Sequence, residues 1–232
     1  MLNKILEAEI YKLGADIVGF GNLSELPKEV RLGLPIGISI AIKFDKDIIR
    51  GISKLPTQAY ADQYTEINEK LDCIVTMIAE FLIKQGYQAI AQTRENVGSG
   101  ESEDSTTLPH KTVATRAGIG WIGKCAMLVT EQYGSMIRIS SVLTDAPLQT
   151  AKAINTPRCG DCCACKDACP GEAVSGLPWN PGLHRDDFFD ALKCRKAAEE
   201  RSVAGFGGDI TICGKCIEIC PWTRRVLQGL AE

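Results

Sequence analysis

Eleven cysteines are the residues of this 232-residue chain with the greatest chemical potential, and nine of them lie after residue 150. The first run, residues 159–170, reads CGDCCACKDACP. Without Cys163 its spacing is C-x2-C-x2-C-x3-C-P, the bacterial ferredoxin spacing for a [4Fe–4S] cluster. The second run, residues 213–221, reads CGKCIEICP and lacks the leading cysteine, because Ile210 stands at that position. The repeated spacing predicts two clusters.

Two cubane clusters need eight thiolates, and the two runs supply seven. Cys194, in the segment between the runs, is predicted to be the eighth ligand. In two-cluster ferredoxins the last cysteine of a run ligates the other cluster, and we expect it to open a helix here. The crossed arrangement predicts one cluster on Cys159, Cys162, Cys165 and Cys220 and the other on Cys169, Cys194, Cys213 and Cys216.

Zinc is the alternative metal, since it also binds four thiolates from paired C-x2-C motifs. It does not explain the third evenly spaced cysteine or the repeated Cys-Pro, so the spacing favours iron–sulfur. Three cysteines are left over. Cys163 is interpreted as a spare thiol, Cys73 as a core residue of a helix, and Cys125 as a buried, inert thiol rather than a nucleophile.

Composition and charge indicate the cellular compartment of the protein and the classes of partner that it could bind. An odd number of cysteines excludes a fully paired internal disulfide framework. Glu7 and Glu9 interrupt the first apolar run, which argues against a signal peptide. The longest near-apolar run, residues 32–42, is shorter than the roughly 20 residues that span a bilayer. We therefore expect a cytoplasmic protein without a membrane partner, whose clustered cysteines bind metal. A net charge of −3 offers no broad basic surface for nucleic acid.

Residues 1–150 carry the patterning of an α/β (α+β) domain. Apolar spacing predicts a helix from residue 2 to Gly14 and a long helix over 64–82 that ends at Gly86. Strands are predicted over 15–20, 36–44, 87–91, 126–130 and 135–144. The second strand has a face of small residues at 37, 39 and 41, against which another element could pack closely. Residues 145–158 read as a linker, so we predict domains 1–150 and 151–232.

A glycine-rich segment, AGIGWIGK at residues 117–124, precedes one of these strands. It matches neither a dinucleotide fingerprint nor a Walker loop, because neither the spacing nor the flanking elements agree. Glycine permits close backbone approach to a ligand, so a cofactor could lie here. A tight structural turn with Trp121 as a core plug is an equal interpretation from the residues alone.

This segment, the stretch GSMIRISSVLTDAPL at 134–148 and the two cysteine runs together resemble epoxyqueuosine reductases and their relatives, the reductive dehalogenases. The likeness covers roughly residues 90–225. It implies a nitroreductase-like domain that holds cobalamin without a histidine lower ligand, followed by a two-[4Fe–4S] ferredoxin-like domain that reduces the cobalamin. It also favours the glycine segment as a cofactor site, in which Lys124 is a charged donor. The residues implied to bind the cofactor are Gly118, Gly120, Trp121, Ile122, Gly123 and Lys124.

The resemblance also implies a proton donor and a substrate class. An aspartate thirteen residues before Ala117 is the family's donor, and Asp104 stands there in this chain, with His110 as a competitor because its ordinary pKa is about 6.5. Eleven residues follow Pro221, without the extension that helps the family hold tRNA. We therefore expect a small-molecule or protein substrate rather than tRNA, and reduced ferredoxin or flavodoxin as electron donor. A non-enzymatic electron carrier for a corrinoid protein and a flavin-dependent reductase are the alternatives.

Overall fold

The computed structural model describes residues 1–98, 100, 106–208 and 210–230, and the chain divides into two compact units. The sheet unit comprises Met1–Ile42, Ile67–Gly120 and Arg138–Ile154. The cysteine unit comprises Lys43–Glu66, Trp121–Ile137 and Asn155–Glu232. The units interleave along the chain, because two stretches from the first 150 residues group with the cysteine-rich part. The division into domains at residue 150 stays a prediction.

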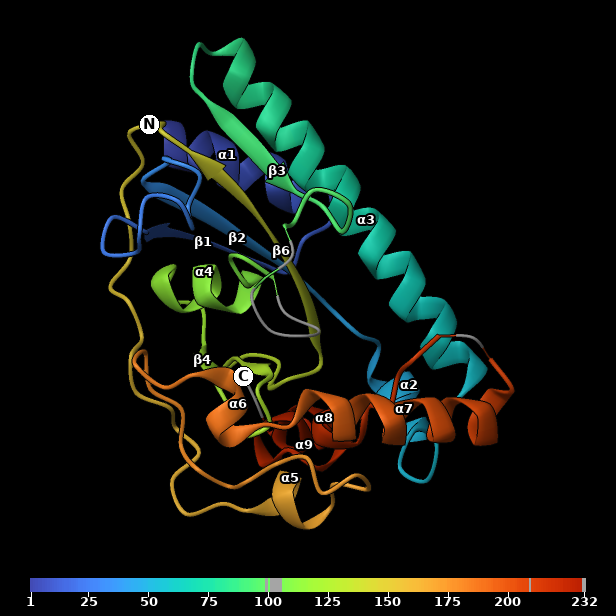
Figure 1. Ribbon diagram of the computed structural model, residues 1–232. Coiled ribbons are helices and arrows are strands. Elements are labelled where there is room, and N and C mark those ends of the chain that lie inside the picture. The colour runs from blue at the N-terminus through green and yellow to red at the C-terminus, as the bar shows by residue number, and fades with distance from the viewer. Residues whose placement is uncertain (99, 101–105, 209, 231–232) are drawn as a thin grey trace. The chain divides into compact units, whose positions relative to one another are not determined.

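The sheet unit contains a four-stranded sheet whose strands are not in chain order, and the sequence predicts all four strands. The order is β1 (Ile17–Asn22), β2 (Ile36–Lys43), β6 (Ile137–Thr144) and β3 (Ala89–Gln92) (Figure 1). β1 pairs antiparallel with β2, with Ile17 opposite Ala41, and β3 pairs antiparallel with β6, with Ala89 opposite Thr144. Observed strand ends differ from the predicted ones by about two residues, as is usual for pattern-based boundaries.

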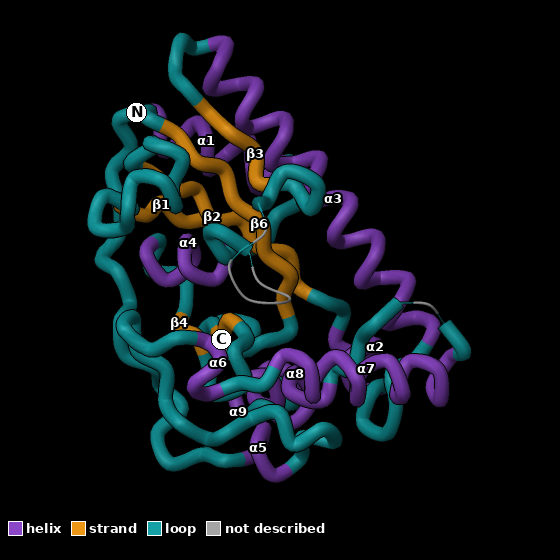
Figure 2. The backbone as a smooth tube through the Cα atoms, in the orientation of Figure 1, coloured by secondary structure: helices purple, strands orange, loops and turns teal. Residues whose placement is uncertain are grey.

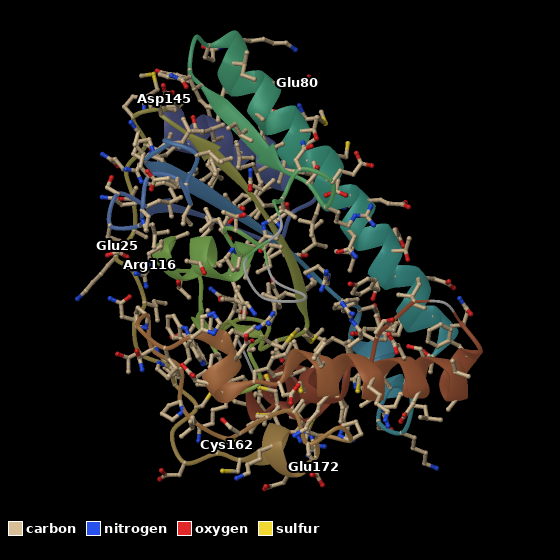
Figure 3. All side chains as sticks on the ribbon, in the orientation of Figure 1. Glu25, Glu80, Arg116, Asp145, Cys162 and Glu172 are labelled. Atoms are coloured by element: carbon tan, nitrogen blue, oxygen red, sulfur yellow. The ribbon has the colours of Figure 1, made fainter. Side chains whose placement is uncertain are left out.

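Helix α4 (His110–Arg116) packs on the face that carries the small residues. A Cβ on Gly37 would lie 2.5 Å from Cγ1 of Val113, and a Cβ on Gly21 would lie 2.6 Å from the backbone nitrogen of Ala117. Glycine at these positions therefore lets the helix approach the sheet. Arg116 is buried and forms an ion pair with Glu25, which ties the end of α4 to the loop after β1 (Figure 3).

The other face of the sheet is covered by α1 (Leu2–Lys12) and α3 (Gln58–Lys84) (Figure 1). Both helices were predicted, although α3 begins six residues before residue 64. The core interpretation of Cys73 is wrong, because this side chain is exposed. Helix α3 buries Leu71 and Ile74, whereas Cys73 lies on the outward strip with the exposed Met77 one turn later.

The cysteine unit consists of the 16-residue helix α7 (Ala191–Phe206) and several shorter helices, joined by long loops (Figure 2). A small hairpin of β4 (Trp121–Ile122) and β5 (Leu128–Val129) packs in it through an edge-on contact of Trp121 with Trp222, at 4.9 Å between ring centroids. None of the described helices is both long and apolar enough to cross a bilayer. The helices of the unit, besides the first turns of α3, are α2 (Lys46–Gly51), α5 (Ala164–Asp167), α6 (Arg185–Phe188), α7 (Ala191–Phe206), α8 (Lys215–Ile219) and α9 (Pro221–Leu227).

Candidate iron–sulfur sites

Thiols from both cysteine runs line one cavity of about 150 Å³ in the cysteine unit. The four cysteines predicted to bind the first cluster all lie on its wall, although one of them comes from the second run. The remaining wall includes Gly123 and Lys124 at the end of the glycine segment and the start of α9. The thiols that line the cavity are Cys125, Cys159, Cys162, Cys165, Cys216 and Cys220. The structure thus brings the first predicted ligand set together, and the assignment of ligands stays a prediction.

Local turns and helix ends position the thiols of this first site. The amide of Cys162 donates to the carbonyl of Cys159 at 3.1 Å, which closes the C-x2-C turn. Cys165 lies in α5. Cys220 ends α8 and is the N-cap of α9, with Pro221 at the first helical position, where proline is favoured. The predicted helix after the second Cys-Pro is therefore present.

The helix predicted after the first Cys-Pro is absent, and this expectation is wrong. Helix α5 ends before Cys169, and the chain then turns, with the amide of Ala173 donating to the Cys169 Sγ at 3.3 Å. Glu172, labelled in Figure 3, has a φ of +51°. That left-handed conformation is incompatible with a right-handed helix at this position.

The second predicted site is built around Cys169, Cys194 and Cys213. Burial, followed by the nearby Cys213 and Cys169, raises the pKa of Cys194 to about 11. Cys194 lies in the first turn of α7, whose N-cap Asp190 accepts a hydrogen bond from the amide of Lys193 at 2.9 Å. The thiol proposed to complete the second set therefore lies beside two of its three predicted partners.

Gly171 explains how the turn after Cys169 comes so close to α7. A Cβ at this position would lie 2.6 Å from the carbonyl oxygen of Lys193 and 2.8 Å from the Cβ of Ala197. These two residues flank Cys194 on the helix. Gly171 is not among the residues predicted from the sequence, although the Cys-Pro-Gly tripeptide is a visible signal.

The spread of the thiols around a cavity bears on the choice of metal. Among the residues that the structure describes, no three His, Cys, Asp or Glu side chains converge on a single-ion site. Zinc holds four thiolates about 2.3 Å from one ion, whereas each iron of a cubane takes its own thiolate, so cubane ligands lie farther apart. Cys216, predicted for the second cluster, also lines the first cavity, and its assignment stays a prediction.

A buried cation lies against the first site. The Lys124 side chain is buried, and its Nζ donates to the carbonyl oxygen of Cys162 at 3.1 Å. A Cβ on Gly123 would lie 3.7 Å from the Cys159 Sγ. A positive charge here offsets the negative charge that thiolates bring to a buried site. The end of the glycine segment therefore belongs to the cavity of the predicted cluster.

The rest of the glycine segment serves turns and the core. Gly118 has a φ of +68°, and a Cβ there would lie 3.0 Å from the carbonyl oxygen of Lys152, so the turn after α4 requires glycine. Trp121 is only 1% exposed, and its Nε1 has no hydrogen-bond partner among the described residues. Ile122 packs in a small core cluster with Trp179. Gly120 lies between α4 and β4, and the cofactor-binding role of all six residues stays a prediction.

Helices α8 and α9, which flank Cys220, are tied together by Glu218. Its buried carboxylate accepts hydrogen bonds from Lys215 and Arg224, each at 2.9 Å. Burial alone would raise the pKa of Glu218, but the hydrogen bonds from Arg224 and Lys215 outweigh it and lower the pKa. The contact with Arg224 therefore links α8 to α9 across Cys220.

Of the two predicted proton donors, the structure describes only His110. Asp104 lies outside the described residues. His110 is the first residue of α4 in the sheet unit, and its Nδ1 is 2.9 Å from the Ser141 Oγ. Burial lowers the pKa of His110 to about 4, with a contribution from Arg138 and partial opposition from Asp72. His110 is therefore neutral at pH 7, and its role as a proton donor stays a prediction.

The pKa of His110 predicts part of the acid sensitivity of the fold. In the unfolded chain His110 has a pKa of about 6.5, whereas in the folded chain it stays neutral down to about pH 4. The unfolded state therefore binds more protons between these pH values, and the free energy of unfolding should fall as the pH drops through them. The contribution is no more than about 3 kcal/mol. Denaturant unfolding of wild type and His110→Gln across pH 4–7 should show a smaller pH dependence in the variant. Parallel pH profiles for the two proteins would contradict this expectation.

Comparison with known protein families identifies the cysteine-rich part. Residues 158–223, which contain both runs and Cys194, match the family model described as 4Fe-4S double cluster binding domain. The chain is similar to the epoxyqueuosine reductase of Synechococcus sp. (strain CC9605), with 32% identity over 139 residues. That match covers 60% of this chain and 43% of the relative, so the chain spans less than half the length of that reductase.

Solved structures share the fold across nearly the whole chain. A reductive dehalogenase, described with a mechanism for B12-dependent dehalogenation, superposes with a TM-score of 0.72 and 20% identity, covering 98% of this chain and 34% of that one. An epoxyqueuosine reductase in complex with a tRNA-Tyr stem loop gives a TM-score of 0.60 and 21% identity, covering 96% and 65%. The α/β fold class and the resemblance drawn from the sequence motifs are confirmed.

Proposed function

We propose that this chain is an iron–sulfur oxidoreductase of the epoxyqueuosine reductase type, in which two [4Fe–4S] clusters deliver electrons to a cobalamin that reduces a substrate. The observation that carries the proposal is the cavity wall shared by thiols of both runs and by Gly123 and Lys124. The end of the glycine segment that resembles the reductases thus lies against the thiols predicted to bind the first cluster.

The residues present at the first site fit a cluster. Thiolates are the usual ligands of [4Fe–4S] clusters, and burial and hydrogen bonds to sulfur set the reduction potential. Trp222 and Pro221 form part of the cavity wall around these sulfurs. Lys124 fixes the Cys162 loop and supplies positive charge. The unpartnered Nε1 of Trp121 is a further donor in the same unit.

The cobalamin part of the proposal depends on the resemblance of residues 117–124 and on the fold shared with the B12-dependent dehalogenase. When bound, cobalamin supplies a cobalt centre that exchanges electrons with the clusters and the substrate. Gly118 and Gly123 are approached by protein atoms, from Lys152 and Val129. Glycine at these two positions therefore serves the protein's own turns, and the proposed corrinoid contacts of the segment depend on the resemblance.

For the substrate we propose a small molecule or a protein, with reduced ferredoxin or flavodoxin as donor. The net charge of −3 is the support, because two oxidised cubanes with their thiolates would bring the holo-protein to about −7. A polyanion such as tRNA is bound mainly through phosphate contacts with cations. Retention of tRNA at physiological salt by the reconstituted chain would contradict this choice of substrate.

The decisive experiment is anaerobic purification and cluster reconstitution, followed by metal analysis, an absorption spectrum and titration with cobalamin. We expect about eight iron atoms per chain and a change in the corrinoid spectrum. Stoichiometric zinc with little iron would overturn the cluster assignment, and an unchanged spectrum without retained cobalt would overturn the cobalamin assignment. A flavin spectrum would favour the flavin-dependent reductase, and electron transfer to a corrinoid protein without turnover would favour the carrier.

A further inference from the structure

Cys125 is a buried thiol that the proposed function does not use. It is 6% exposed and lines the same cavity as the predicted cluster ligands. The thiols of Cys165 and Cys216 line this cavity with it and are the side chains that interact with it. In the crossed arrangement these two partners ligate different clusters. Cys125 therefore touches one predicted ligand of each cluster.

The backbone around Cys125 holds this thiol in a fixed place. It lies in the turn of the β4–β5 hairpin, where the Gly123 amide donates to the Met127 carbonyl at 2.8 Å and the Ala126 amide donates to the Gly123 carbonyl at 2.9 Å. Ala126 has a φ of +60°, which tightens the turn. The hydrogen bond from Lys124 to the Cys162 carbonyl anchors the same turn to the first cysteine run. These contacts fix the backbone from which the Cys125 side chain enters the cavity.

We propose that Cys125 is a positioning residue that donates an S–H hydrogen bond to a cluster-ligating thiolate and thereby raises the reduction potential of the cluster. The inference rests on the proposed function in one respect, namely that Cys165 and Cys216 bind clusters. Ligating sulfurs carry no hydrogen, so Cys125 is the thiol of the three that retains one to donate. The added electron increases the negative charge on the ligand sulfurs, and a donor stabilises that reduced state more than the oxidised one.

Removing the donor should therefore make the cluster harder to reduce. Cys125→Ala removes the donor, and Cys125→Val removes it while retaining a side chain of similar bulk. In both variants we expect the ratio of reduced to oxidised cluster at a given potential to fall about tenfold. For one electron this is about 59 mV toward lower potential. Cys125→Ser retains a hydroxyl donor and should recover most of the loss. If Cys125 only fills space in the cavity wall, the valine variant should keep the wild-type potential and the serine variant should not.

The test is an EPR-monitored redox titration of the reconstituted full chain without cobalamin, with iron counted in each variant. Cys73→Ser is the matched control, because that thiol is exposed in the sheet unit. About eight iron atoms in all variants, with a lower potential in the alanine and valine variants alone, would support the proposal. Equal potentials throughout, or iron loss in Cys125→Ala as expected of a ligand, would overturn it. Wild type without clusters would overturn the proposed function itself, which separates the two failures.

Discussion

Replacing Cys220 with serine should abolish the cluster held by the first cysteine run, although Cys220 belongs to the second run. Iron should fall from about eight to about four atoms per chain, since one of two cubanes is lost. Cys194→Ser should cause the same loss of iron at the other cluster. Each variant should retain the cluster that the other one loses.

The reason lies in the spatial neighbours of the two thiols. Cys220 lines the cavity with the three leading cysteines of the first run. Burial raises the pKa of its thiol, and Cys159 is close enough to raise it further. Cys194 instead lies beside Cys169 and Cys213. The predicted ligands, apart from Cys216, therefore group by tertiary neighbourhood rather than by sequence run.

Iron analysis combined with EPR of the reduced proteins checks this pair of variants. The signals that survive in Cys220→Ser and Cys194→Ser should differ, and together they should account for the wild-type spectrum. Cys163→Ser is the control, because Cys163 is the N-cap of α5 and bonds only weakly to the Asp161 carbonyl, at 3.5 Å. Loss of the same signal in both variants, or greater iron loss in the control than in Cys194→Ser, would refute the crossed arrangement.

Local spacing predicted the parts of the site that depend on short-range geometry. The C-x2-C turn at Cys159–Cys162 is closed by one backbone hydrogen bond, which the spacing alone makes possible. The helix after Cys220 follows from proline at a first helical position. The same rule failed after Cys169, because Glu172 adopts a left-handed conformation in a turn that packs closely against α7.

Contacts between distant segments could not be read from the sequence. Alternation predicted the strand at residues 36–44, but the order of the sheet depends on pairings such as Ala89 with Thr144. The placement of Lys124 depends on the register of two-residue strands, whose pattern is too short to read. Cys73 was assigned to the core from the general burial of cysteine, whereas the outward strip of α3 decides its exposure.

Gly171→Val should cost the chain its second cluster and leave the first in place. A Cβ at residue 171 would lie 2.6 Å from the Lys193 carbonyl oxygen, closer than such atoms approach one another, so the turn must move away from α7. That movement separates Cys169 from Cys194, and metal–ligand distances tolerate only about 0.2 Å. Iron should fall to about four atoms per chain, with the EPR signal that also survives in Cys194→Ser.

Gly51→Ala is the matched control for this substitution, because a Cβ at residue 51 meets nothing within 4 Å and alanine favours the helix α2 in which it lies. It should retain about eight iron atoms. If Gly171→Val also retained them, the close approach of the Cys-Pro-Gly turn to α7 would not be what brings Cys194 to its partners. If it lost the signal that survives in Cys194→Ser, Cys169 would ligate the first cluster rather than the second. The substitution thus tests the eighth ligand without touching any sulfur.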